Sequence, residues 1–322
     1  MANKPIKENL FYYASSELTQ DAFLAYVFAN YKNLESFVKQ LIEDFTGIQV
    51  NKIESIIIKK QEKKIDLIVM IEYDSKKVLT IVIEDKKTTN QHDNQLRKYE
   101  GIIDNLKLKD PYFIYYKTDI ILEDIHEPWK KFDIEKISSI FHQNDYKHNE
   151  IINHYAGYVN YINNIIQNPT PELDFSDPNS NYFIIRKLIK DVIEISKIQN
   201  RFTATKKPGG ILIFSIDKEC SKNFYFEYTY GEKIDIKICK CKNMNKMLTH
   251  KILKEDFKGP EGFSEKNKND NYEYYNNKIN PYLFKYKNKR IDSYSDLKDT
   301  IYKAVKEYLE WYDKVNRPLS KP

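Results

Sequence analysis

The 322-residue chain has few glycines, few cysteines, few arginines and no long apolar run, and each shortage excludes a class of protein. Its 8 glycines argue against collagen-like sequences, glycine-rich linkers and most glycine-dependent phosphate loops. No apolar stretch reaches the roughly 20 residues that span a bilayer, and the N-terminus lacks the apolar core of a signal peptide. We therefore expect a soluble, cytoplasmic protein with no membrane partner.

Cysteine and charge carry little functional information. The three cysteines, Cys220, Cys239 and Cys241, are too few for a disulfide framework and have no further zinc ligands at a usable spacing. The net charge is +5, and almost all of the basic residues are lysine, since only five of the 52 are arginine. Lys, Asn, Ile and Tyr all use AT-rich codons, so this charge permits a nucleic-acid partner without indicating one.

The first third of the chain alternates between helical and extended patterns. Apolar spacing predicts a helix capped by Ser15 or Ser16, and a second one that is capped by Asn33 and ended by Gly47. The remaining predicted elements are strands at 53–59, 64–73 and 78–84, a helix from Asn90 or Gln91 to Leu106, and a strand at 112–117. The order is therefore helix, three strands, helix, strand, an α/β arrangement with a mixed central sheet.

The rest of the chain predicts a second domain. Helices are expected near residues 133–141 and 149–166, and the proline-containing segment 168–180 is the best linker candidate. After the linker, the patterns predict a helix at 182–198, strands at 211–216, 224–230 and 233–240, and a helix at 293–312. We therefore expect domains at residues 1–167 and 181–322, the second an α+β module of unknown role.

Two carboxylates and a lysine interrupt the apolar strands of the first domain. Asp66 lies in KKIDLIVMIEY, while Glu84 and Lys86 lie in TIVIEDKK and share one face by the period of 2. A three-residue turn, Asp74–Lys76, would place Asp66 opposite Glu84, and a two-residue turn would place it opposite Asp85. With either turn, two carboxylates and a lysine come together on neighbouring strands.

A divalent cation would explain these residues. Like charges on opposing strands are destabilising, and a buried lone carboxylate is costly, unless a hard cation lies between them. Mg²⁺ or Mn²⁺ held by Asp66 and Glu84 could polarise a phosphoryl oxygen and acidify an attacking water. Lys86 would hold that water or balance the charge that develops on phosphorus. The alternative for Asp66 is a surface ion pair with a lysine, which contributes little stability.

Element order and residue types resemble the PD-(D/E)XK nuclease superfamily over about residues 11–120. That family has an αβββαβ restriction-endonuclease-like core, with its Asp on the second strand and (D/E)-x-K on the third, as in Asp66 and Glu84-Asp85-Lys86. Gln95 and Tyr99 resemble the Q-x-x-x-Y element of RecB-like members.

The resemblance implies a role for each matching residue. Asp66 and Glu84 would hold the metal, with the Asp85 backbone carbonyl and Glu17 completing its shell. Lys86, Gln95 and Tyr99 would serve catalysis. Two basic side chains on the following helix, Arg97 and Lys98, would contact phosphate.

The sequence departs from the family pattern in two places. Ile65 stands where the proline before the Asp would be, and Asp85-x-Lys87 offers a second phasing of the motif. We favour Glu84 and Lys86, because Glu84 directly follows the apolar run 81–83.

The predicted function is a Mg²⁺-dependent phosphodiesterase that acts on nucleic acid, with DNA favoured over RNA. A defence or restriction enzyme that needs an activator is a narrower form of this prediction. The alternative is a catalytically inactive nuclease-like module that binds nucleic acid or protein, since fold does not fix function. A homodimer is compatible with either.

Overall fold

A computed structural model describes residues 9–14, 16–87, 94–142, 149–169, 183–184, 186–192, 202–207, 211–216, 224–229, 235–240, 263–265, 282–286 and 293–316. Contacts between residues divide the chain into two compact units, Met1–Asn168 and Pro169–Pro322. Most of the expected linker, 168–180, lies outside the described residues, so the predicted domain limits stay a prediction.

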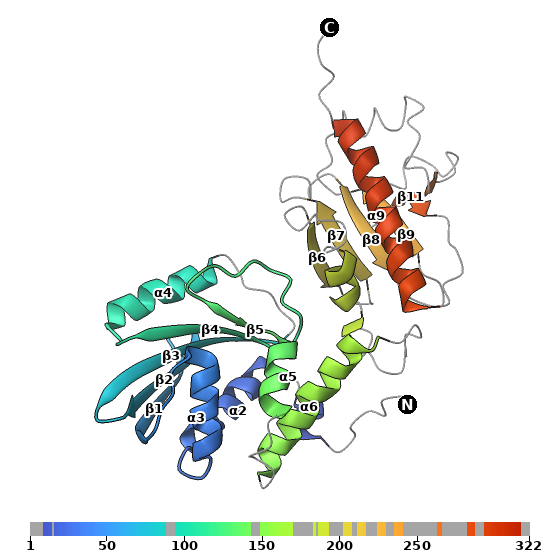
Figure 1. The fold of residues 1–322 in the computed structure, drawn as a ribbon. Helices are drawn as coiled ribbons and strands as arrows, with labels where there is room; N and C mark the ends of the chain where they lie inside the picture. Colours follow the sequence, from blue (N-terminus) through green and yellow to red (C-terminus); the bar gives the residue numbers. More distant parts are fainter. Residues whose placement is uncertain are drawn as a thin grey trace. The chain divides into compact units, whose positions relative to one another are not determined.

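The first unit is a β-sheet with helices on both faces (Figure 1). Its helices are α1 (Leu10–Tyr13), α2 (Glu17–Ala29), α3 (Glu35–Thr46), α4 (Gln95–Leu106), α5 (Ile134–His142) and α6 (Glu150–Gln167). Its strands are β1 (Ile53–Glu62), β2 (Ile65–Tyr73), β3 (Lys77–Lys86), β4 (Pro111–Lys117) and β5 (Lys130–Phe132). The four strands predicted for this unit are confirmed, with ends that differ from the prediction by at most three residues.

The sheet is mixed and has the order β1-β2-β3-β4-β5. The first three strands form an antiparallel meander, whereas β4 runs parallel to β3 and β5 parallel to β4. Helix α4 makes the crossover between β3 and β4, as a parallel connection requires. The predicted α/β fold with a restriction-endonuclease-like core is therefore confirmed.

Helix α3 shows where local sequence signals hold and where they fail. Gly47 ends the helix at φ 80°, a left-handed conformation that glycine adopts without steric cost. The predicted N-cap was wrong, because Leu34 rather than Asn33 occupies that position. Asn33 instead belongs to the preceding turn, where its backbone N–H donates to the Asn30 carbonyl at 2.9 Å.

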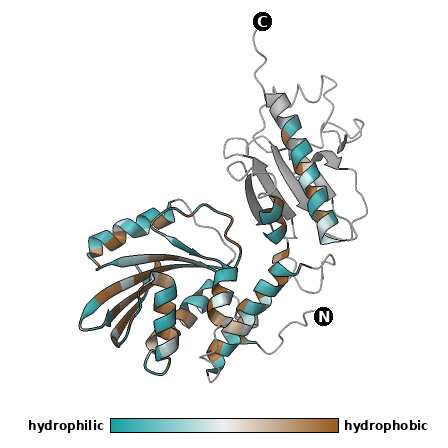
Figure 2. Ribbon diagram, viewed as in Figure 1, coloured by the Kyte–Doolittle hydropathy of each residue, from teal (hydrophilic) through white to brown (hydrophobic). Residues whose placement is uncertain are grey.

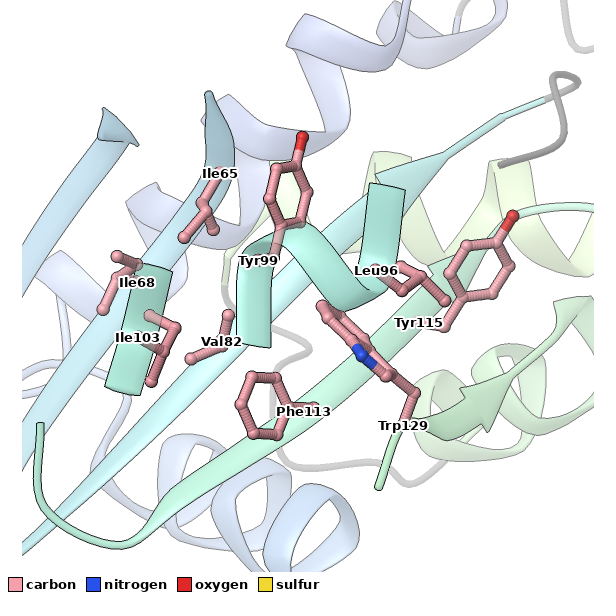
Figure 3. Close-up of a cluster of buried hydrophobic side chains, with 9 residues drawn as sticks. All are labelled: Ile65, Ile68, Val82, Leu96, Tyr99, Ile103, Phe113, Tyr115 and Trp129. Carbon is pink, nitrogen blue, oxygen red and sulfur yellow. The ribbon is translucent and has the colours of Figure 1, made fainter. Parts of the chain in front are cut away.

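Side chains from both layers of helices bury the sheet. Leu96, Tyr99 and Ile103 of α4 pack against strand residues on one face, as Figure 3 shows. On the other face, Phe23 of α2 stacks on Tyr155 of α6 with ring centroids 3.8 Å apart. Figure 2 shows many hydrophobic residues along the strands of this sheet and mostly hydrophilic residues along α4. Helices therefore cover both faces of the sheet with apolar side chains.

The second unit contains an antiparallel sheet and a long helix. Its described elements are β6 (Phe202–Lys207), β7 (Ile211–Ile216), β8 (Phe224–Thr229), β9 (Asp235–Lys240), β10 (Phe263–Glu265), β11 (Tyr282–Tyr286) and α9 (Tyr294–Asn316). The strand order is β10-β11-β9-β8-β7-β6. Patterns in the sequence predicted β7, β8, β9 and α9 and missed the other strands. No helix in the described part of the chain is long and apolar enough to cross a membrane.

Candidate active site

The register of β2 and β3 brings Asp66 and Glu84 together. Tyr73 pairs with Lys77 across a three-residue turn, and the ladder runs to Leu67 opposite Ile83. The next residues on the two strands are Asp66 and Glu84, so the three-residue alternative is the correct one. The Asp66 carboxylate also accepts a hydrogen bond from the Asp85 backbone N–H at 2.9 Å, which fixes its position against β3.

Glu84 and Lys86 form a buried ion pair next to Asp66. The Glu84 side chain is fully buried and Lys86 is only 7% exposed. Lys86 Nζ lies 2.5 Å from Glu84 Oε1, but the contact lacks hydrogen-bond geometry, and neither Glu84 oxygen has a hydrogen-bond partner. A buried carboxylate with unused lone pairs is costly, and it is suited to a cation that supplies what the protein does not.

Burial and like charge determine the proton affinity of this pair. Burial, followed by the neighbouring charge of Asp66, raises the pKa of Glu84 to about 8, against the opposing effect of Lys86. Burial acts to lower the pKa of Lys86, but the charges of Glu84, Glu17 and Asp66 outweigh it and raise that pKa. Without a cation, the site therefore favours the neutral form of Glu84 at neutral pH.

The side chain of Asp85 points to the opposite face of the sheet. Its Oδ1 accepts a hydrogen bond of 2.6 Å from Gln20 Nε2 on α2, and its Oδ2 has no hydrogen-bond partner. Burial and the charges of Asp21, Asp66 and Glu17 raise its pKa well above the ordinary value. The predicted metal role for the Asp85 backbone carbonyl stays a prediction.

Three residues near the site were missed by the sequence analysis. Gln61 Nε2 donates to both Asp66 Oδ1 and Asp21 Oδ2, each at 3.1 Å, and so links β1 and α2 to the site. Burial and Asp66 raise the pKa of Asp21 to about 6. Gln20 and Asp21 are polar positions on a helix that buries Phe23 and Leu24, and this is the signal that could have found them.

Glu17 lies at the start of α2, as predicted, and reaches the end of β3. Its Oε1 accepts a hydrogen bond of 3.3 Å from the Lys87 backbone N–H. Its charge also contributes to the pKa shifts of Asp85 and Lys86. The structure thus brings Glu17 close to the carboxylate cluster, on the α2 side of the sheet.

Helix α4 brings Gln95 and Tyr99 to the same end of β2. Gln95 Nε2 donates to the Tyr99 hydroxyl at 2.7 Å, and that hydroxyl donates to the Lys64 carbonyl at 2.6 Å. Gln95 Oε1 is buried and has no partner. Figure 3 shows the Tyr99 hydroxyl at the margin of the apolar cluster. The neighbouring Arg97 and Lys98 are exposed on α4.

Lys117 is a second buried lysine beside the site, and the sequence analysis did not identify it. It pairs with Lys86 in the parallel register of β3 and β4, and it is fully buried. Its ammonium group lies 2.8 Å from Glu123 Oε1, which also accepts from the Tyr115 hydroxyl at 2.6 Å. Glu123 therefore neutralises a charge that would otherwise lie next to Lys86.

The donor set at this end of the sheet fits a hard divalent cation. Asp66 and Glu84 offer carboxylate oxygens, and those of Asp66 keep lone pairs beyond their two hydrogen bonds. In the described part of the chain, no three His, Cys, Asp or Glu side chains are arranged to hold a metal ion. Two carboxylates with waters and substrate phosphate are what Mg²⁺ usually takes, whereas structural zinc needs four protein ligands.

Comparison with known proteins shows that this region is similar to a known family. Residues 9–168 match the family model of the PD-(D/E)XK nuclease superfamily. Neither curated proteins nor solved structures give a match. The matched segment contains Asp66, Glu84 and Lys86 together with α4, and it extends past the 11–120 region of the sequence resemblance. The match to this superfamily and the observed fold are thus consistent with each other.

Proposed function

Starting from this match to a nuclease superfamily, we propose that the chain is a divalent-metal-dependent nuclease that hydrolyses phosphodiester bonds in DNA. One observation carries the proposal. Asp66, Glu84 and Lys86 meet at the end of β2 and β3, where the buried Glu84 carboxylate lies 2.5 Å from the Lys86 ammonium and beside Asp66. Two carboxyl groups buried side by side are costly for stability, and a divalent cation between them would offset that cost.

Asp66 and Glu84 would hold the cation, with the Asp85 carbonyl as a further ligand, while Glu17 would contribute negative charge from the α2 side of the sheet. Bound there, Mg²⁺ or Mn²⁺ would polarise the scissile phosphate and lower the pKa of a bound water. The hydrogen bonds that Asp66 accepts from Asp85 N–H and Gln61 keep its carboxylate oriented for this role.

Lys86 and Gln95 would act on the reacting groups. The Lys86 ammonium is held beside Glu84, from where it can stabilise negative charge on the phosphate during attack. Gln95 Oε1 is an unused acceptor that can orient the attacking water, because Tyr99 and the Lys64 carbonyl hold the Gln95 amide in place. This Gln95–Tyr99 pair supports placement in the RecB-like branch.

Arg97 and Lys98 would contact the nucleic-acid backbone. Both are exposed on α4, one turn or less from Gln95 and Tyr99. Contacts of this kind supply salt-dependent affinity without sequence preference. Charge reversal of Lys98 should therefore weaken binding and reduce its salt dependence without changing which sequences are cut.

Nicking of supercoiled plasmid DNA with Mg²⁺ or Mn²⁺ tests the proposal. Asp66→Asn and Lys86→Met should each lower the rate by at least about 100-fold, as removal of an electrostatic stabiliser does. Lys87→Met is the matched control, because it removes the lysine of the alternative Asp85-x-Lys87 phasing. An equal loss of nicking rate in Lys86→Met and Lys87→Met would contradict the Glu84-x-Lys86 phasing. Full activity in Asp66→Asn would show that Asp66 is not part of the active site.

Metal titration separates the nuclease from the inactive alternative. Calorimetry with Mn²⁺ should show binding to the intact chain and to Lys86→Met, but not to Glu84→Gln. Metal and DNA binding without cleavage would favour a nuclease-like binding module.

Two further experiments test the finer parts of the proposal. Cleavage of an RNA substrate of the same sequence tests the preference for DNA. Phage plating on cells that carry wild type or Lys86→Met tests a defence role.

A further inference from the structure

The two edges of the first sheet differ in how open they are. Strand β5 ends the sheet with three residues, two of them Lys130 and Lys131, which is a common way to block pairing at an edge. Strand β1 forms the other edge with ten residues, and in the described part of the chain only β2 pairs with it. A long edge strand presents unpaired backbone N–H and C=O groups to another chain.

The sequence of β1 is complementary to itself when reversed. If two β1 strands run antiparallel with Ile57 opposite Ile57, then Glu54 opposes Lys60. This opposite-charge pair occurs twice, because the arrangement is symmetric. An axis at Ile56 would place Glu54 opposite Ile58, and an axis at Ile58 would place it opposite Glu62, so the register about Ile57 is favoured.

The apolar residues of β1 agree with the same register. Ile57 is 56% exposed, although it lies in the middle of a strand. Ile56 and Ile58, which would pair with each other across the two copies, are half-buried on the opposite face. Pairing would cover all three, and the burial of their exposed surface would add to the backbone hydrogen bonds.

The remaining contacts of β1 define the ends of the paired segment. A bulge lies between Ile53 and Ser55, and the Glu54 carbonyl accepts a hydrogen bond of 3.3 Å from the Tyr31 hydroxyl. These features interrupt the edge at Glu54. At the far end, the Gln61 side chain donates hydrogen bonds to Asp21 and Asp66. The open segment is therefore Glu54–Lys60, which is the segment bounded by the two symmetric Glu54–Lys60 pairs.

We propose that two copies of the chain associate through antiparallel pairing of their β1 strands about a two-fold axis at Ile57. The two five-stranded sheets then form one continuous sheet of ten strands. Because the axis is perpendicular to the sheet, the α4 faces of both copies lie on the same side. The Gln61 residues that contact the two candidate sites follow directly on the paired segments.

Charge reversal tests this pairing with an internal control. Sedimentation velocity on the full chain should show self-association over about a hundredfold range of concentration. Glu54→Lys and Lys60→Glu should each weaken it roughly 10- to 100-fold, because like charges then meet twice. An equimolar mixture of the two variants should associate as strongly as wild type, because in the mixed pair every position 54 opposes an opposite charge at position 60.

A second pair of variants tests the apolar centre of the interface. Ile57→Lys should weaken association, whereas Ile151→Lys, which alters an exposed isoleucine of α6, should not. A monomer at all concentrations would overturn the proposal. So would association that the β1 variants leave unchanged, or a mixture of Glu54→Lys and Lys60→Glu that fails to restore it.

Discussion

Replacing Glu84 with Gln should stabilise the metal-free protein at pH 7. Burial and the charge of Asp66 raise the pKa of Glu84 from 4.5 to about 8. As the pH rises above about 4.5, the unfolded chain releases this proton while the folded chain keeps it. The free energy of unfolding therefore falls by about 1.4 kcal/mol per pH unit up to about pH 8. Between pH 4.5 and pH 7 this amounts to roughly 3 kcal/mol. Gln avoids this cost without removing a counter-charge from Lys86, because Glu84 with a pKa of about 8 is mostly protonated at pH 7.

A divalent cation should reverse this order. A cation that binds only the folded wild type increases its free energy of unfolding in proportion to the logarithm of the metal concentration. Glu84→Gln lacks one of the two carboxylates that would hold the ion, so the same addition should leave it nearly unchanged. The residue that weakens the metal-free fold would then be the one on which metal binding depends, as is common at functional sites.

Urea unfolding followed by the fluorescence of Trp129 provides the measurement. Trp129 is 3% exposed and packs in the cluster under α4, so it reports on the first unit. A Trp311→Phe background removes the only other tryptophan of the chain. The curves would be recorded at pH 4.5 and pH 7, each in EDTA and in Mg²⁺. If wild type is the more stable protein at pH 7 in EDTA, or if Mg²⁺ stabilises both proteins equally, the reasoning is wrong.

Three further substitutions test the surroundings of the site. Glu123→Gln should cost about 3–5 kcal/mol in urea unfolding at pH 7, because it leaves the ammonium of Lys117 buried without its counter-charge. Burial acts to raise the pKa of Glu123, but Lys117 lowers it, so wild type should lose this advantage as the pH falls below about 4.5. Tyr99→Phe removes the hydrogen bond to the Lys64 carbonyl and should cost about 1 kcal/mol while lowering the nicking rate; an unchanged rate would exclude the positioning role of Tyr99. Gly47→Ala should lower stability by about 1 kcal/mol through backbone strain alone, because nothing lies within 4 Å of the added Cβ; thermal unfolding that shows no loss would contradict this.

Local sequence patterns were sufficient for the elements that position the site. The apolar run before Glu84, the two-residue period and the short turn at residues 74–76 predicted a hairpin with acidic residues at its open end. Gly47 marked the end of a helix correctly, because its left-handed conformation depends only on the residue itself. The prediction for Asn33 was wrong because its backbone N–H is used in the preceding turn, which moves the start of the helix one residue further along.

Several contacts around the site could be found only from the three-dimensional structure. Gln61 belongs to the site because β1 ends beside Asp66 and because α2 brings Asp21 to the same point. Lys117 and Glu123 pair because β4 runs parallel to β3 and places one lysine beside another. No spacing along the chain encodes these contacts, since they arise from the packing of elements against each other.

The amino-acid sequence by itself determined the element types, the residues of the nuclease motif and their likeness to a family, because these depend on periodicity and residue chemistry over short distances. Only the tertiary structure decided that Asp66 faces Glu84 rather than Asp85, since a one-residue change of register moves every side chain to the opposite face. It also decided the protonation of Glu84, because burial, which results from packing, exceeds the effect of its neighbouring lysine.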